Sequence, residues 1–207
     1  MGDRVCTARG GGGAGMVVWD DVEIRISTVL PERSESCTDL VTAIRDQTGE
    51  SPWVSPHPRG RPPSDMVHRI FGDSPDTEWL LYVQDDVRLA PTFGEVIPRV
   101  LEETERVAVQ FFDLRNRELG LTTARKPLYS MCCLAVQSAI VEDYVAFYKD
   151  WIETVDHEMA ADIGFGKFCT EISEPVDVYR PSQVQHRELP STFTGRSTRR
   201  QSPTFEG

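Results

Sequence analysis

The sequence predicts an α/β protein, a single layered domain in which a mixed β-sheet is flanked by helices. Short apolar runs that are typical of buried strands alternate with longer segments whose apolar residues recur at helical spacing. The resulting order of strand, helix, strand, helix, strand is typical of layered α/β architecture. A length of 207 residues with 39% hydrophobic residues suits one domain with a substantial core.

The expected strands are short apolar segments. Residues 23–30 alternate Ile24 and Ile26 with polar neighbours, and residues 78–83 form a run of the kind that fully buried strands show. Further strands are expected at residues 106–112 and 175–179, with another apolar segment at 128–136.

Helices are expected at residues 36–47, 64–71, 93–104 and 140–154. In the first of them Leu40 and Ile44 recur at helical spacing, and Gly49 follows where a helix would stop. Residues 53–63 are expected to form a surface loop instead, because the prolines at positions 52, 56, 58, 62 and 63 interrupt both helix and strand.

Composition divides the chain into three parts. Residues 1–20 are expected to be a flexible, Gly-rich leader, residues 21–190 the folded domain, and residues 191–207 a tail rich in Arg and Ser. Residues 10–15 formally contain G-x-G-x-x-G, but no apolar strand precedes the motif and no clear helix follows it. A dinucleotide-binding fingerprint needs that strand-turn-helix context, so we do not assign one.

The charge balance excludes some ligand classes. A formal net charge of −11 makes a long-range field that attracts nucleic acid or anionic membrane improbable. No 18-residue apolar run is present, and residues 1–9 lack the apolar centre of a secretion signal, so a cytoplasmic location is expected. The five cysteines form no C-x-x-C pair, and the adjacent Cys132 and Cys133 lie in an apolar stretch, which favours reduced core thiols.

Two adjacent carboxylates, Asp85 and Asp86, follow the expected strand at residues 78–83. A desolvated carboxylate must be paired, protonated or bound to a metal, so this pair indicates a cation site. Ligands of open α/β sheets bind at the carboxyl ends of strands, which is where the pair falls. The alternative is a helix cap and a turn residue ahead of the next helix.

Two segments resemble the GT-A, Rossmann-like glycosyltransferases. The sequence W-L-L-Y-V-Q-D-D-V-R-L-A-P-T-F at residues 79–93 is similar to the strand that delivers their EDD or DxD metal motif, with Gln84 in place of the usual first acidic residue. D-I-G-F-G at residues 162–166 and Y-R-P-S-Q-V-Q-H at residues 179–186 are similar to the late part of that fold. The likeness is greatest to enzymes that transfer N-acetylglucosamine, through their P-S-x-x-Q-H segment.

The resemblance implies roles for three of these residues. Asp86 and His186 would hold a divalent cation, and carboxylate with imidazole suits Mn²⁺, although Mg²⁺ would also be accepted. Asp162 would be the general base that deprotonates the acceptor hydroxyl. For Asp162 a helix N-cap is the alternative, and for His186 a hydrogen-bonded structural role.

Binding of the donor would involve further residues near both ends of the domain. Thr28, Leu30 and Arg33 follow the first strand, where the family binds the nucleotide, and Asp85 adjoins the metal ligand. Arg196, Arg199 and Arg200 would close over the diphosphate, because each guanidinium group can bind two phosphate oxygens at once. The alternative for these three arginines is a solvated tail. Phe111, Phe112 and Asp113 would form a floor for sugar or acceptor, unless the two rings belong to the core.

The expected function is transfer of a sugar, N-acetylglucosamine or glucose, from a UDP-sugar to a hydroxyl, with inversion implied by the resemblance. The acceptor is left open among glycan, protein, small molecule and the modified DNA base of a virus. Two alternatives remain: a nucleotidyltransferase or phosphotransferase that uses the same acidic pair, and a carbohydrate-binding or scaffold domain without turnover.

Overall fold

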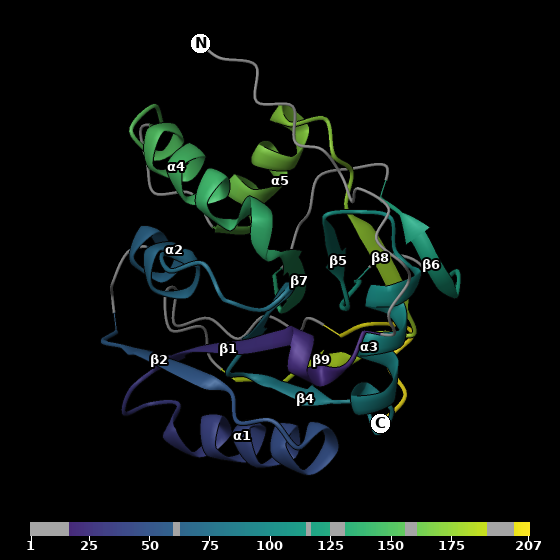
Figure 1. Ribbon diagram of the computed structural model, residues 1–207. Helices are drawn as coiled ribbons and strands as arrows, with labels where there is room; N and C mark the ends of the chain where they lie inside the picture. The colour runs from purple at the N-terminus through teal and green to yellow at the C-terminus, as the bar shows by residue number, and fades with distance from the viewer. Residues whose placement is uncertain (1–16, 60–62, 115–116, 125–130, 156–160, 190–200) are drawn as a thin grey trace.

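The computed structural model describes residues 17–59, 63–114, 117–124, 131–155, 161–189 and 201–207 (Figure 1). For positions 63, 64, 161 and 162 it describes the backbone alone. Among these residues, no helix has the length and apolar composition needed to span a bilayer.

A seven-stranded mixed sheet forms the centre of the molecule, in the order β2-β1-β3-β7-β5-β8-β6. β1, β2 and β3 run parallel, β7 is antiparallel to both β3 and β5, and β5 runs parallel to β8. The strands are β1 (Val22–Val29), β2 (Trp53–His57), β3 (Trp79–Gln84), β5 (Ala108–Gln110), β6 (Gly120–Thr123), β7 (Cys133–Gln137) and β8 (Asp177–Arg180). A separate antiparallel pair consists of β4 (Val87–Leu89) and β9 (Val184–His186).

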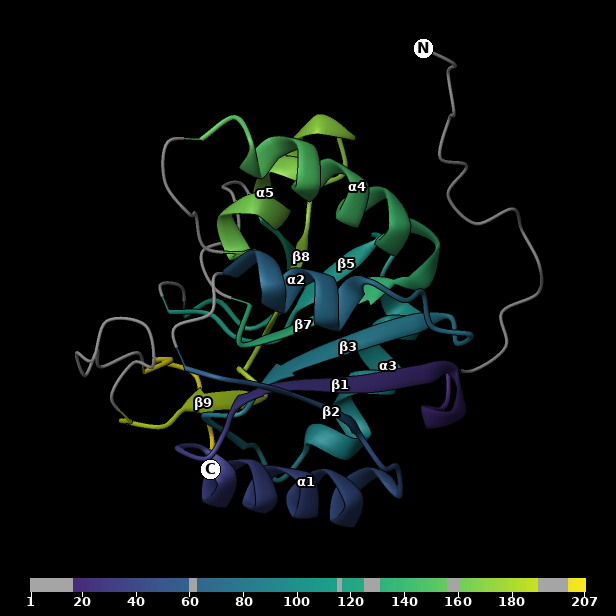
Figure 2. The same ribbon diagram turned by 90° about the vertical axis from the view of Figure 1, so that its left-hand side faces the viewer.

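Helices cover both faces of the sheet, as Figure 2 shows with α1 on one side and α2, α4 and α5 on the other. The helices are α1 (Ser34–Thr48), α2 (Pro63–Phe71), α3 (Phe93–Glu103), α4 (Val141–Ile152) and α5 (Ala161–Glu171). Two short 3₁₀ turns, Trp19–Asp21 and Ser138–Ile140, precede β1 and α4.

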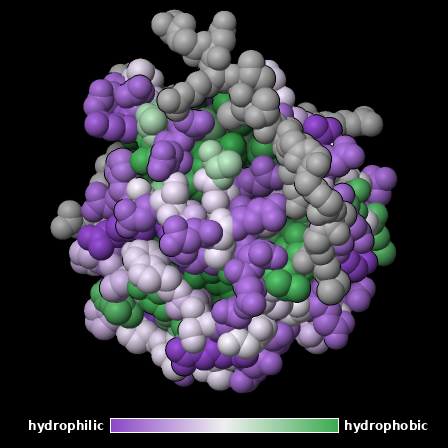
Figure 3. Space-filling view, in the orientation of Figure 1, coloured by the Kyte–Doolittle hydropathy of each residue, from purple (hydrophilic) through white to green (hydrophobic). Residues whose placement is uncertain are grey.

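Strand β3 shows how one segment serves both layers. Leu81 and Val83 pack in the core cluster that contains α1 and α3, whereas Leu80 and Tyr82 pack in the cluster that contains α2, α4 and α5. Successive side chains of a strand point to opposite faces, so a strand buried on both sides is a continuous apolar run. On the face in Figure 3 the surface is largely hydrophilic, with apolar residues in separate small areas.

The expected α/β class is therefore confirmed, and the predicted helices at 36–47, 64–71, 93–104 and 140–154 correspond to α1, α2, α3 and α4. Gly49 ends α1 with a φ of 78°, a left-handed conformation that glycine adopts without strain. The four cysteines in the described part of the chain, Cys37, Cys132, Cys133 and Cys169, are buried and free, as predicted.

The prediction of a loop at residues 53–63 is wrong for its first half, which is the edge strand β2. The Leu30 N–H donates to the His57 carbonyl at 3.2 Å, so the backbone groups of His57 face β1. Backbone groups of the preceding residue point the other way, and Pro56 thus has its missing N–H on the outer side. A proline is tolerated there because no ladder hydrogen bond is lost.

The G-x-G segment after Asp162 is helical, because it lies within α5. Gly164 has a packing role: a Cβ at this position would lie 2.5 Å from ring carbons of Tyr148 on α4. The glycine therefore allows the two helices to approach closely. Because α5 begins at Ala161, the backbone of Asp162 lies in the first turn of this helix.

Candidate metal site

The candidate site lies where the parallel strands of the sheet end. β1, β2 and β3 share one direction, so their carboxyl ends meet at one edge, and the turn formed by Asp85 and Asp86 follows β3 directly. The pairing of β4 with β9 then brings His186 opposite Val87. Two residues that are far apart in sequence, Asp86 and His186, are thereby brought together.

Asp86 is the centre of a largely buried polar cluster. Its Oδ2 atom lies 3.3 Å from His186 Nε2 and 3.6 Å from Arg33 Nη2. The three side chains are 15%, 8% and 6% exposed, respectively, so water screens the electrostatic interactions among them only weakly. The other carboxylate oxygen, Oδ1, is buried and has no hydrogen-bond partner in the described part of the chain.

The hydrogen bonding of His186 determines what its second nitrogen can do. Nδ1 lies 2.7 Å from the carbonyl oxygen of Arg187, and because a carbonyl can only accept, Nδ1 carries the proton. In the neutral ring, Nε2 therefore presents a lone pair to the Asp86 carboxylate. Two atoms with lone pairs at this distance need a proton or a metal cation between them, and a carbonyl bound to Nδ1–H is the usual orienting contact of a metal-binding histidine.

Asp85 points back to the sheet rather than towards His186. Its Oδ2 accepts the Val29 N–H at 3.2 Å, which fastens the carboxylate to the end of β1. Burial raises the pKa of this carboxyl from 3.8 to about 6. The neighbouring Asp86 also raises the pKa, whereas the Thr28 hydroxyl, Arg33 and the Val29 N–H lower it.

Among the described residues, no group of three or more His, Cys, Asp and Glu side chains is arranged to hold a metal ion. Asp86 and His186 form a two-residue set instead. Asp86 Oδ1, which no described residue contacts by a hydrogen bond, and the orientation of His186 fit a cation whose other ligands come from a bound substrate. This donor set of one carboxylate and one imidazole is of the kind expected for Mn²⁺ or Mg²⁺.

Comparison with solved structures identifies the fold. A glycosyltransferase involved in the glycosylation of the major capsid of PBCV-1 superposes with a TM-score of 0.50 at 14% identity, over 77% of this chain and 82% of that chain. The chain has a GT-A fold. No protein-family model matches the sequence. No curated protein matches it either.

More distant structural matches include both sugar and nucleotide transferases. The glycosyltransferase GlyE of Streptococcus pneumoniae TIGR4 matches with a TM-score of 0.46 at 9% identity, over 77% of this chain and 45% of that chain. A nucleotidyl transferase from Methanothermobacter thermautotroptrophicus matches with a TM-score of 0.42 at 8% identity, over 77% and 87% of the two chains. The chain thus spans less than half the length of GlyE.

Within the GT-A fold, the residues predicted to bind the nucleotide occupy different environments. Thr28 is buried beside Asp85, Leu30 is 40% exposed at the end of β1, and Arg33 is buried against Asp86. The inward orientation of Arg33 could not be predicted from sequence, because an arginine after a strand is ordinarily at the surface. Donor contacts of these residues and of Asp85 stay predictions.

His57 is a residue at this edge that sequence reasoning missed. It ends β2, is buried, and lies beside Val29 in the strand register. Burial lowers the pKa of its imidazole. The prolines of residues 53–63 made this strand look like a loop. The topology was the available signal, because two parallel neighbouring strands are usually joined by a helix, and a strand was therefore to be expected after α1.

Phe111 and Phe112 are fully buried core residues, so the floor predicted for sugar or acceptor is wrong for both rings. Asp113 at the same segment forms an ion pair with Arg180, with 2.5 Å between Oδ2 and Nη2. The Asp113 N–H also donates to Ser182 Oγ at 3.0 Å. These contacts connect the end of β5 to the loop between β8 and β9.

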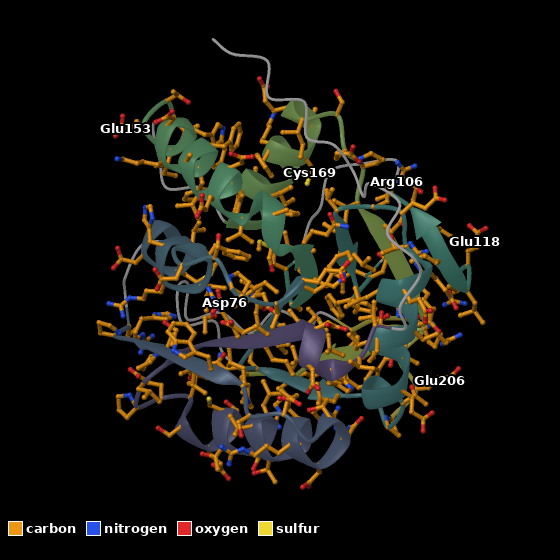
Figure 4. All side chains as sticks on the ribbon, viewed as in Figure 1. Asp76, Arg106, Glu118, Glu153, Cys169 and Glu206 are labelled. Carbon is orange, nitrogen blue, oxygen red and sulfur yellow. The ribbon has the colours of Figure 1, made fainter. Side chains whose placement is uncertain are left out.

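Residues 201–207 pack against the segment that leads to His186. Ser202 and Thr204 are buried, and Ser202 Oγ lies 2.7 Å from Ser182 Oγ. The Ser202 N–H donates to Gln185 Oε1 at 3.1 Å, directly beside the predicted metal ligand. Figure 4 labels Glu206, which belongs to this segment.

The remaining predicted site residues are outside the described part. Arg196, Arg199 and Arg200 fall in residues 190–200, and the side chain of Asp162 is likewise not described. Their roles at the diphosphate and as general base stay predictions.

Proposed function

We propose that this chain is a divalent-cation-dependent glycosyltransferase that uses a nucleotide-sugar donor and a hydroxyl acceptor. The observation that carries the proposal is the pairing of Asp86 and His186 at the carboxyl edge of the sheet. Asp86 Oδ1 is buried there and has no hydrogen-bond partner among the residues that the structure describes. The GT-A fold supports the transferase class, and the resemblance of residues 79–93 and 179–186 supports sugar transfer. UDP as carrier and N-acetylglucosamine or glucose as sugar are proposed from that resemblance.

In this proposal the chain's own residues hold and orient the donor. Asp86 and His186 would hold Mn²⁺ or Mg²⁺, which supplies positive charge to the departing diphosphate. His186 is oriented by its Nδ1–H bond to the Arg187 carbonyl, so its free nitrogen faces the site. Asp162 would take the proton of the acceptor hydroxyl while that oxygen attacks the anomeric carbon opposite the diphosphate, which inverts the configuration.

Calorimetry with UDP, UDP-N-acetylglucosamine, UDP-glucose, GDP, CMP, dTDP, UTP and CTP, each with Mn²⁺ or with chelator, tests the proposal. We expect one nucleotide to bind in a metal-dependent manner and Asp86→Ala to abolish that binding. Asp150→Ala, which removes an exposed carboxylate from α4, is the control and should bind as the unchanged protein does. Equal affinity of the Asp86 variant would refute the site, and binding of nucleoside triphosphates in preference to all diphosphates and nucleotide-sugars would favour a nucleotidyltransferase.

A further inference from the structure

Arg33 is an arginine whose backbone is fixed while its side chain enters the candidate site. Its N–H donates to the Val29 carbonyl at 2.9 Å, and its own carbonyl accepts the Cys37 N–H at 2.9 Å and the Ser36 hydroxyl at 3.1 Å. These bonds hold the residue at the junction of β1 and α1. Arginine is rarely buried without a counter-charge, yet the Arg33 side chain is only 6% exposed.

The counter-charge of Arg33 is the carboxylate of Asp86, the predicted metal ligand. Arg33 Nη2 lies 3.6 Å from Asp86 Oδ2, the same oxygen that faces His186 Nε2. Arg33 also lowers the pKa of Asp85, so its charge acts on both adjacent carboxylates. A single guanidinium therefore acts on both carboxylates, and it offsets one of their two negative charges in the protein without a metal.

We propose that Arg33 is a placeholder cation: it neutralises Asp86 in the empty site, and an incoming divalent cation displaces it towards the diphosphate of the donor. This inference rests on the proposed function. A divalent cation on Asp86 would lie within a few ångströms of the guanidinium, and like charges at that distance in a buried site repel strongly. The long arginine side chain can turn away while the backbone stays fixed, and phosphate oxygens are preferred partners of guanidinium.

The arrangement has a consequence for the order of binding. Metal alone must compete with Arg33 for Asp86, whereas metal together with a nucleoside diphosphate offers the displaced arginine a new partner. If Arg33 occupies Asp86 in about nine of ten molecules, the apparent affinity for metal alone is about tenfold weaker than the intrinsic affinity. Metal and diphosphate then strengthen each other's binding by the same factor, as linkage requires.

The test is Arg33→Gln, measured with Mn²⁺ alone by electron paramagnetic resonance and with UDP plus Mn²⁺ by calorimetry. We expect about tenfold tighter binding of Mn²⁺ alone and weaker binding of UDP in the presence of Mn²⁺. Arg33→Lys keeps a competing charge, so it should leave the affinity for Mn²⁺ alone near that of the unchanged protein. Arg33→Met keeps the apolar stem and replaces the Gln variant if the latter does not fold.

The opposite signs of the two measurements separate this role from a purely structural ion pair. Loss of a structural contact would weaken Mn²⁺ binding and UDP binding together, and that result, or unchanged Mn²⁺ affinity in the Gln variant, would overturn the inference. Asp86→Ala is measured alongside. If Mn²⁺ binding survives that change, the proposed function fails; if it is lost while Arg33→Gln behaves as the unchanged protein, only the placeholder role fails.

Discussion

Replacement of Asp85 by asparagine is expected to change how the stability of the fold depends on pH. The carboxyl has a pKa of about 6 in the folded protein, against an ordinary value of 3.8, chiefly because it is buried. The folded state therefore binds the proton more tightly than the unfolded state does. Stability contributed by this group is present at low pH and is lost as the pH rises from about 4 to about 6.

The size of the effect follows from the two pKa values. The gap between 3.8 and about 6, at about 1.4 kcal/mol for each pH unit, corresponds to about 3 kcal/mol. Asparagine has nearly the same shape as a protonated carboxyl and is neutral at every pH, and its oxygen can still accept the Val29 N–H. Relative to the unchanged protein, Asp85→Asn should thus gain about 3 kcal/mol of unfolding free energy between pH 4 and pH 7.

Urea unfolding of both proteins in chelator, at intervals across this pH range, measures the difference directly because other titrating groups cancel. Thr28→Val provides a second check: the Thr28 hydroxyl lowers the pKa of Asp85, so its removal should move the midpoint of the pH dependence upwards. A difference between Asp85→Asn and the unchanged protein that stays constant from pH 4 to pH 7 would refute the reasoning, since it would mean that Asp85 titrates alike in the folded and unfolded states.

Two further substitutions on α5 test packing and catalysis. Gly164→Ala should improve helix propensity by about 1 kcal/mol, but its Cβ would meet the Tyr148 ring at 2.5 Å, and overpacking costs about 1–3 kcal/mol. We expect a melting temperature lower by a few degrees, with the exposed Lys167→Ala on the same helix as control; a higher value for the glycine variant would contradict the close approach. Asp162→Asn should preserve donor affinity in calorimetry and lower turnover by about 10² to 10⁴, as for loss of a general base; near-normal transfer would leave Asp162 as a helix residue only.

The long periodic and apolar segments were predictable because their pattern is local. Residues 78–83 form a continuous apolar run, which is typical of a strand buried on both faces, and β3 occupies Trp79–Gln84. By contrast, β4 and β9 have three residues each, too few for a pattern, and they exist because they pair with each other. β2 was missed for another reason: an edge strand tolerates Pro56, which sequence rules treat as a breaker.

The acidic pair of the site could be predicted from sequence, whereas the contacts of Asp86 with other side chains could not. Asp85 and Asp86 follow a buried strand, so their charges need a partner, and this conclusion follows from the sequence alone. His186 came from the resemblance, and the structure brings it to 3.3 Å from Asp86. The inward orientation of Arg33 depends on how α1 packs against β1 and β4, a tertiary relation that no local pattern contains.

The pairing of β4 with β9 also sets when the site can form during synthesis. Arg187 Nε donates to the Val87 carbonyl across 100 residues of sequence. At about 5–20 residues per second, a ribosome needs roughly 5–20 s to cover that distance. Throughout this interval Asp86 has been synthesised and His186 has not. Arg33 precedes both in the sequence, so it is already present in the nascent chain as a counter-charge for Asp86.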